Sequence, residues 1–533
     1  MDVLLWLFRL MGKILRLLGR GLWWLVRLPF GHTHRRKGGT HGSSRWATRW
    51  EQWKGRAIRG EGIILGRGAF RRLLRFSTDG MVMVFASMGA GKGLGVVIPS
   101  LLTYRGSMLV TDPKGENYAI TRRHRATLGK VRMMNPRDLA HSDRFNPMDI
   151  IRKGTPSEAD DAQALAQLMV KPDARESHWD DKATSLLKAL ILHALYEPAE
   201  SRNLATVRRL SVGSRETFIA TLEEIAETSP SLAARESASG ILTSAIDADG
   251  KFSEEFSSIH SNMQKATEPW SAGSPAGILS ATSSFDLKEL TTETTTLYLC
   301  VDEDVLSVYE RWLRVMVGCT LKTLTRAKAN PPKRKVVLLL DEVAVLGRLD
   351  ELENQSGILR AYCTPVLIWQ NLPQITKIYH KDAEAFLANA SARVFFGIND
   401  NHTANYVATM LGHTTTLSNS HGTSHSAGTW QQESQQQGQS ESGYWLLDAA
   451  ELQRLPVTRT IVKLRNVPYS IRGHRIDYRK VRRWRGLWDR WHGVPLHGLN
   501  SVPVMEPQGD HDPLPTTPPP SYPASGVSAR SPS

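Results

Sequence analysis

Cysteine is scarce in this chain, and long apolar runs are missing. The 533 residues include three cysteines, Cys300, Cys319 and Cys363, without the paired spacing of a zinc site. This count excludes a disulfide framework and fits a reducing cytosol. No uninterrupted apolar stretch approaches the roughly 20 residues that a membrane-spanning helix needs. The sequence therefore predicts a protein without disulfides and without a spanning helix.

Positive charge is concentrated in two segments. The formal net charge is +15, but residues 1–60 hold thirteen Lys and Arg against two acids, and residues 472–490 hold eight against two. The rest of the chain is nearly neutral. A length of 533 residues with 41% hydrophobic residues is enough for two or more domains. Basic surfaces are therefore expected at the two segments rather than over the core.

The first segment has the pattern of an amphipathic helix. Within residues 1–30 the charges fall on one helical face, and Leu, Trp, Phe and Ile fill much of the rest. These charges are Arg9, Lys13, Arg16, Arg20 and Arg27. We predict a helix lying in the membrane interface; the alternative is a helix packed on the protein itself or on a partner. Residues 31–60 are predicted to form a basic linker.

A phosphate-binding loop is predicted after the apolar run at 81–85. Small residues and a lysine follow that run, and then a helix-compatible segment. The predicted loop comprises Ser87, Met88, Gly89, Ala90, Gly91, Lys92 and Gly93. Its glycines allow positive φ and close approach of the backbone, and its lysine supplies a charge to the β- and γ-phosphates. The alternative is a glycine turn with an incidental lysine. Gly93 departs from the general motif, because it removes the hydroxyl that usually binds Mg²⁺.

A second part of the site is predicted at the ends of two further strands. The apolar run 336–340 ends in Asp341, a predicted Mg²⁺ ligand, and Glu342, predicted to orient the attacking water. Gln370 follows the predicted strand 365–369 and suits contact with the γ-phosphate. Arg360 is predicted to act as an arginine finger in a neighbouring subunit's site. Chance carboxylates at a strand end, and surface hydrogen bonds or salt bridges, are the alternatives. Asp112 and Lys114 are expected beside the phosphate loop.

The order of predicted strands and helices gives the organisation of the chain. Residues 61–154 and 286–480 alternate strands and helices, which predicts a parallel sheet with ligands at the carboxyl ends of its strands. Residues 155–285 are predicted to form an all-α insertion. Two runs, 459–464 and 469–476, are predicted to be edge strands.

Two polar stretches are expected to lie outside the core. Residues 413–442 are rich in Ser, Thr, His, Gln and Gly and are predicted to form a flexible loop. Residues 479–491 interleave basic residues with Trp484, Trp488 and Trp491, which suits phosphates, bases or a membrane surface. The alternative is a solvated basic helix whose tryptophans pack on the motor. The segment 481–533 is thus predicted to be basic and aromatic at first and disordered from 501 onward.

Several motifs, taken together and in order, resemble one family. They include GSSRWAT at 42–48, GIILGR at 62–67, MGAGKGLGVVIPSLL, SMLVTDPKGEN, MMNP at 133–136, LLLDEVAVLGRLD, WQNLPQI, FGINDNHTANYVATMLGHTT and LDAAELQRLP. Over roughly residues 42–480 the chain resembles the TraG-like coupling ATPases of type IV secretion and bacterial conjugation. In that family Gly often follows the lysine, so Gly93 looks like a family trait.

The resemblance implies an α/β fold, a RecA-like P-loop NTPase motor domain with an inserted all-α domain, that binds ATP and Mg²⁺. It implies a ring-shaped homohexamer at the cytoplasmic face of the bacterial inner membrane. It also implies recruitment of a single-stranded DNA–relaxase complex, or of protein cargo, to a type IV secretion channel. The roles of Arg360 and Gln370 carry over by their positions relative to Glu342. Many members begin with two spanning helices, and this sequence shows none, so peripheral docking or a membrane partner is expected.

We therefore predict an ATP-driven coupling protein. One alternative is an FtsK-like double-stranded DNA translocase, which a small DNA-binding domain after the motor would favour. The other alternative is a non-hydrolysing ATP-binding membrane adaptor, which Gly93 favours.

Overall fold

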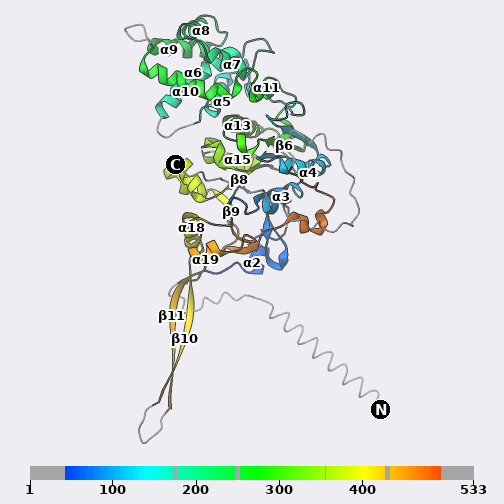
Figure 1. The fold of residues 1–533 in the computed structure, drawn as a ribbon, viewed down its shortest axis with the longest axis vertical. Coiled ribbons are helices and arrows are strands. Elements are labelled where there is room, and N and C mark those ends of the chain that lie inside the picture. The colour runs from blue at the N-terminus through cyan, green and yellow to red at the C-terminus, as the bar shows by residue number, and fades with distance from the viewer. Residues whose placement is uncertain are drawn as a thin grey trace, which may run out of the picture.

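The computed structural model describes residues 42–59, 61–77, 79–171, 177–245, 252–354, 356–425 and 433–493. The predicted amphipathic helix at 1–30 and the predicted tail from 501 onward lie outside these residues. In the described part, an eleven-stranded sheet carries a helical region at one end of the molecule and a long hairpin at the other (Figure 1).

The centre of the sheet is parallel. In spatial order its strands are β9 (Ala390–Phe396), β3 (Met81–Ala86), β8 (Cys363–Trp369), β7 (Val336–Leu340), β4 (Met108–Asp112), β6 (Thr295–Cys300) and β5 (Lys130–Met134). Each pairs in parallel with its neighbours. β3, β7 and β8 are buried throughout, because helices cover both faces of such sheets and leave no polar side to the strands. The predicted parallel α/β architecture is confirmed.

Helices connect these parallel strands or follow the last of them in the chain, β9. They are α3 (Ile98–Leu101), α4 (Glu116–Ala126), α12 (Glu289–Thr292), α13 (Glu310–Arg326), α14 (Asp350–Asn354), α15 (Ser356–Tyr362), α16 (Leu372–Tyr379), α17 (Ala383–Ala388), α18 (Asn401–Leu411) and α19 (Ala449–Arg454). Trp312 and the other apolar residues of α13 are buried, so this long helix forms much of the core.

The stretch between β5 and β6 is helical. It contains α5 (Glu158–Met169), α6 (Ser177–Ala194), α7 (Leu204–Ser211), α8 (Arg215–Thr228), α9 (Leu232–Ala245), α10 (Glu254–Thr267) and α11 (Pro275–Leu279). Figure 1 shows these helices gathered at the end of the molecule opposite the hairpin. None of the helices in the described residues is both long enough and apolar enough to cross a membrane.

Four antiparallel strands extend the sheet beyond β9. They are β12 (Arg459–Leu464), β13 (Ile471–His474), β1 (Ile63–Arg67) and β2 (Leu73–Phe76), in that order. The prediction that β12 and β13 are edge strands is wrong, because β1 and β2 lie beyond them and β2 forms the edge. β1 and β2 are short, and β13, the strand on the other side of β1, is some 400 residues distant, so local sequence gave little sign of them.

The prediction of a flexible loop at 413–442 is wrong for most of that stretch. β10 (His413–His425) pairs with β11 (Glu433–Trp445) in an antiparallel hairpin that extends from the motor (Figure 1). At its base the His413 and Trp445 rings lie 3.8 Å apart between centroids. Low-complexity composition indicates that a segment cannot build a core, but it does not exclude a ladder of backbone hydrogen bonds.

The predicted basic linker is structured from residue 42 onward. Thr48 and Glu51 form a capping box at the start of α2 (Arg49–Lys54), and Ala57 and Ile58 are buried. Glu51 also binds the Arg45 guanidinium, whose hydrogen bonds lower the pKa of Glu51 to about 2. A count of basic residues could not detect this cap.

Residues 478–493 pack on the motor without forming an α-helix. Two 3-10 turns, at Tyr478–Lys480 and Arg482–Trp484, are followed by irregular backbone. Trp484 is buried, and Trp488 and Trp491 pack beside it. The Arg123 side chain binds Asp489 at 2.9 Å. The tryptophans therefore anchor the segment, as the alternative interpretation held, but the basic helix it assumed is absent from these residues.

Candidate functional site

The predicted site residues follow three adjacent strands. β8 lies between β3 and β7, and all three run in parallel. The phosphate loop follows β3, Gln370 follows β8, and Asp341 and Glu342 follow β7. Because the carboxyl ends of parallel strands meet at one edge, these segments come together there.

An ion pair joins the loop lysine to the acidic pair. The Lys92 Nζ atom lies 2.5 Å from Glu342 Oε1 and 3.7 Å from Asp341 Oδ1. Gln370 Nε2 donates to the other Glu342 oxygen at 2.9 Å. Both carboxylates are largely enclosed, with side chains 16% and 18% exposed. Glu342 is thus held between the lysine and the glutamine.

The backbone at Glu342 is strained. Its φ of 53° and ψ of 44° are left-handed, a region that a residue with a long side chain rarely adopts. The Glu342 N–H donates to Asp341 Oδ1 at 3.0 Å, which fixes the two carboxylates relative to each other. Strain of this kind persists where the surroundings impose it and is concentrated at functional sites.

The predicted loop leaves β3 with two glycines in the left-handed region, Gly89 at φ 73° and Gly91 at φ 83°. Met88 is exposed at its tip, while Ala90 is buried and its N–H donates to the Ser87 carbonyl at 3.2 Å. The following helix starts as a π turn, Gly93–Val97. A Cβ atom on Gly93 would meet nothing within 4 Å, so lack of space does not explain the absence of a serine or threonine there.

One residue of this site was missed at the sequence level. Arg475, just after β13, donates from Nη1 to the Ala90 carbonyl. A Cβ atom on Gly91 would lie 1.8 Å from that Nη1, and one on Gly95 would lie 2.6 Å from Arg475 Cγ. The arginine thus packs against the loop where only glycine leaves room. Nothing in the sequence spacing connects residue 475 to residue 90.

Replacing Arg475 by Ala is expected to loosen the phosphate loop. A charge-assisted hydrogen bond contributes about 1.5–3 kcal/mol, so the affinity for nucleotide should fall roughly tenfold. Arg475→Lys keeps the charge but does not reproduce the packing against Gly95. Titration of a fluorescent ATP analogue measures the change, and unchanged affinity in Arg475→Ala would show that the contact does not order the loop.

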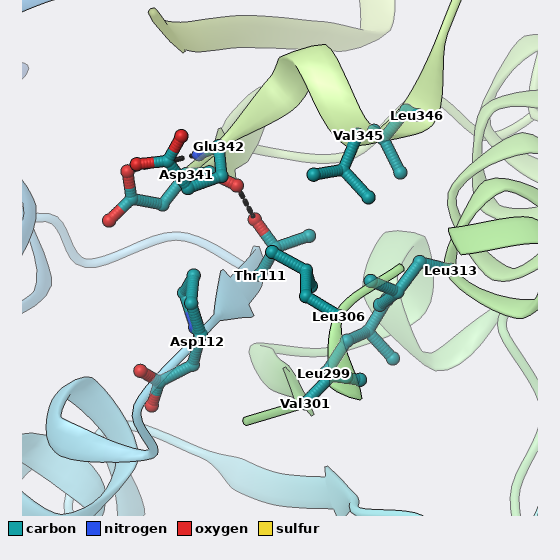
Figure 2. A pocket seen from close by; sticks show the side chains of 11 residues that line it. Thr111, Asp112, Leu299, Val301, Leu306, Leu313, Asp341, Glu342, Val345 and Leu346 are labelled. Atoms are coloured by element: carbon teal, nitrogen blue, oxygen red, sulfur yellow. Dashed lines mark hydrogen bonds between the residues drawn. The ribbon is translucent and has the colours of Figure 1, made fainter. Parts of the chain in front are cut away.

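Asp112 and Lys114 were both expected near the loop, and the structure separates them. Asp112 lines a small recess with Asp341 and Glu342, whose inner wall is apolar (Figure 2). Burial raises the pKa of Asp112 to about 7, although its carboxyl accepts a hydrogen bond from the Tyr118 N–H at 2.8 Å. Lys114 instead lies 3.4 Å from Glu303 in an exposed ion pair.

The ionisation of Asp341 should make stability depend on pH. Burial raises its pKa from 3.8 to about 6, against the opposing effect of Lys92. Because the folded protein holds this proton more tightly than the unfolded chain does, the stabilisation is complete below the unfolded pKa and is lost as the pH rises through about 6.

Asp341→Asn should therefore raise the melting temperature of the nucleotide-free protein above that pH. The expected gain is about 1–2 °C at pH 8, and it should vanish near pH 4. Differential scanning calorimetry at both pH values tests this. A gain of equal size at both pH values would show that the change has another origin.

Arg360 does not join the other predicted residues. It lies exposed on α15, and its Cδ approaches within 4.0 Å of the Cβ position of Gly80, just before β3 begins. The phosphate loop lies beyond the other end of β3. Arg360 therefore cannot complete the site of its own chain.

Comparison with solved structures shows the fold. The conjugative coupling protein TrwB, in complex with the non-hydrolysable ATP analogue ADPNP, matches with a TM-score of 0.60 and 15% identity over 83% of this chain and 96% of TrwB. Its complex with ADP and Mg²⁺ matches with the same score over 82% and 97%. The predicted RecA-like motor fold is confirmed by these likenesses.

Sequence comparison gives relatives of known role. TraG, a conjugal transfer protein of Escherichia coli, is 28% identical over 64% of this chain and 56% of its own length. VirD4 of Agrobacterium fabrum is 26% identical over 70% of this chain and 56% of its own. The chain thus spans about half the length of the curated relatives it matches. The model of the family described as type IV secretory system conjugative DNA transfer matches residues 41–485. The chain belongs to this family.

Proposed function

We propose that this protein is an ATP-driven coupling protein that delivers cargo to a type IV secretion channel. The observation that carries the proposal is the cluster of Lys92, Glu342 and Gln370 at the ends of β3, β7 and β8, in a chain of the conjugative DNA transfer family. A lysine, a carboxylate and a glutamine are among the groups that recur where a phosphoryl group is transferred to water.

The residues present fit a nucleoside triphosphate. Gly89 and Gly91 adopt positive φ, which allows the loop amides of Ser87 to Gly93 to approach phosphate oxygens. The Lys92 ammonium binds Glu342, so a phosphate would compete with that carboxylate for the positive charge. TrwB was solved with an ATP analogue and with ADP and Mg²⁺. We infer that ATP binds here in the same way.

Mg²⁺ fits the same place with Asp341 as its protein ligand. The described residues contain no group of three or more His, Cys, Asp or Glu side chains able to hold a metal. Mg²⁺ needs no such group, because it commonly keeps several waters and takes one carboxylate together with substrate phosphates. When bound, it would neutralise charge on the phosphate oxygens.

We infer a role in ATP hydrolysis for each residue of the site from its contacts. Phosphates would draw Lys92 away from Glu342, and this exchange would leave the Glu342 carboxylate free to accept a proton from a water. Gln370 would keep the Glu342 side chain aimed, because its amide already binds Oε2. Arg475 would hold the loop from behind through the Ala90 carbonyl. Arg360 would act on the site of a neighbouring subunit.

Membership of the family supports a proposal for the partners. We propose a homohexameric ring at the cytoplasmic face of the inner membrane, with a single-stranded DNA–relaxase complex or a secreted protein as cargo and the type IV channel as its destination. The helical region α5 to α11 is the proposed cargo-facing part, since it stands apart from the sheet at one end of the molecule (Figure 1).

The test is ATP hydrolysis by the purified full chain, with and without single-stranded DNA, together with its mass in solution. A DNA-stimulated activity accompanied by a hexamer-sized species supports the proposal. Stimulation by duplex but not by single-stranded DNA would favour the FtsK-like translocase. ATP binding without turnover under every condition would favour the non-hydrolysing adaptor.

A further inference from the structure

Away from the nucleotide site, six arginines line one groove. It is formed by β1, β2, the turn between them and the segment after β13. Its lining consists of Arg67, Arg71, Arg72, Arg75, Arg482 and Arg483, with Ile58, Leu73 and Val481. No ion pair within the described residues includes any of these six guanidinium groups, so within that part of the chain they have no acidic partner.

The arginines also repel one another. Burial, followed by the neighbouring Arg483 and Arg71, lowers the pKa of Arg67. Burial and Arg483 lower the pKa of Arg75, and Glu61 opposes this only in part, being itself 3.3 Å from Arg334. Positive groups gathered without counter-charges form a site for anions.

The groove is held in shape by the surrounding structure. Trp484 is buried directly after Arg482 and Arg483, so the backbone that carries them is anchored. On the other side, Arg67 Nη1 donates to the Arg71 carbonyl at 2.9 Å. Phe70 and Arg71 both have positive φ, 55° and 53°, an unfavourable backbone conformation, and both residues are exposed. Planar guanidinium groups carried on an anchored backbone suit bidentate contacts with phosphate.

An exposed aromatic surface adjoins the groove. The Ala69 N–H donates to Gln52 Oε1 at 2.9 Å, which ties the β1–β2 turn to α2. Three rings on this surface are largely exposed, namely Trp50 at 54%, Trp53 at 47% and Phe70 at 66%. Each has a cation over one face, with Lys54, Arg59 and Arg49 at 4.9, 4.2 and 4.6 Å from the respective centroids.

These features favour an anionic lipid surface over a nucleic acid as the partner of the groove. Each of these rings already holds a cation over one face, so only its other face is free to stack on a base. Aromatic rings mixed with Arg and Lys are instead typical of surfaces at the level of lipid headgroups. Arg49, the first residue of α2, lies 19 residues after the interfacial helix predicted at 1–30, a separation of at most about 65 Å, which lets that helix and this surface contact the same membrane.

We propose that this groove, together with the exposed rings of α2 and Phe70, binds the headgroups of anionic phospholipids and seats the motor domain on the membrane. The groove binds the phosphates, and Trp50, Trp53 and Phe70 enter the headgroup layer. This site is separate from the nucleotide site, so the inference does not depend on ATP turnover.

The test is flotation of the full chain with vesicles of phosphatidylcholine alone or mixed with phosphatidylglycerol. The groove variant replaces Arg71, Arg72, Arg482 and Arg483 by Gln. The control variant removes the same charge from exposed positions elsewhere, at Arg209, Lys265, Lys377 and Lys381. We expect the groove variant to lose roughly tenfold or more in partitioning onto the mixed vesicles, and the control variant less than twofold.

Further arms keep the outcome decisive. Arg→Lys at the same four groove positions should retain most of the binding. Melting temperatures establish that each variant folds. If the quadruple Gln variant does not fold, the double variant Arg71→Gln with Arg72→Gln replaces it. Equal losses in groove and control variants, or equal binding of the wild type to both kinds of vesicle, would overturn the proposal. So would a groove variant that loses binding to a single-stranded oligonucleotide while vesicle binding is unchanged.

Discussion

Replacing Glu342 by Gln is expected to lower the rate of ATP turnover by about a hundredfold or more. Glutamine keeps the shape of the side chain but cannot accept a proton from the attacking water, and a positioned general base contributes at least this factor. The substituted amide would also lose the ion pair with Lys92, now 2.5 Å long. Since Lys92 no longer has to be drawn away from a carboxylate, ATP should bind at least as tightly as to the wild type.

The two readouts separate catalysis from binding. Steady-state hydrolysis measures kcat, and titration with a fluorescent ATP analogue measures affinity. Lys92→Ala is the matched comparison, because it should weaken binding as well as abolish turnover. Retained activity in either variant would contradict the assignment of the site.

Arg360→Ala should have an effect of similar or greater size in the assembled protein. An arginine that stabilises charge on the transferred phosphoryl group contributes about a thousandfold or more to the rate. Because Arg360 lies beyond the far end of β3 from the loop, its contribution must come across a subunit interface. In a ring built by head-to-tail contacts, such a face meets the opposite face of the next subunit.

Mixing inactive subunits provides the decisive measurement. A site formed between a wild-type Glu342 and a wild-type Arg360 occurs in mixed rings of Glu342→Gln and Arg360→Ala subunits, although neither variant alone contains one. Mixed samples should therefore recover activity above that of either parent. Arg465→Ala is a suitable control, as it removes another arginine from the motor. No recovery, with mixed rings demonstrated by mass, would exclude a shared site.

The parallel core and the site on it could be predicted because their signals are local. β7 was expected at its observed bounds, and Lys92, Asp341, Glu342 and Gln370 meet because each follows a strand of one parallel sheet. Apolar runs that end in functional residues are short patterns, and the sheet rule then brings their ends together.

What escaped prediction depends on contacts distant in sequence or on backbone alone. Arg475 touches Ala90 across 385 positions, and its meaning appears only once β13 is placed. The β10–β11 hairpin is stabilised by backbone pairing that leaves no mark in composition. Side-chain periodicity likewise did not predict that β1 and β2 would lie beyond β13 in the sheet.

The pairing of β1 with β13 also bears on how the chain folds during its synthesis. Arg67 lies opposite His474 in this pair. On the ribosome, β1 emerges long before β13 does, and until then β1 can pair only with β2. The contact of Arg475 with the phosphate loop is made by the same late segment. We therefore expect the loop to become fully ordered only near the end of synthesis, so that a nascent chain binds nucleotide more weakly than the complete motor does.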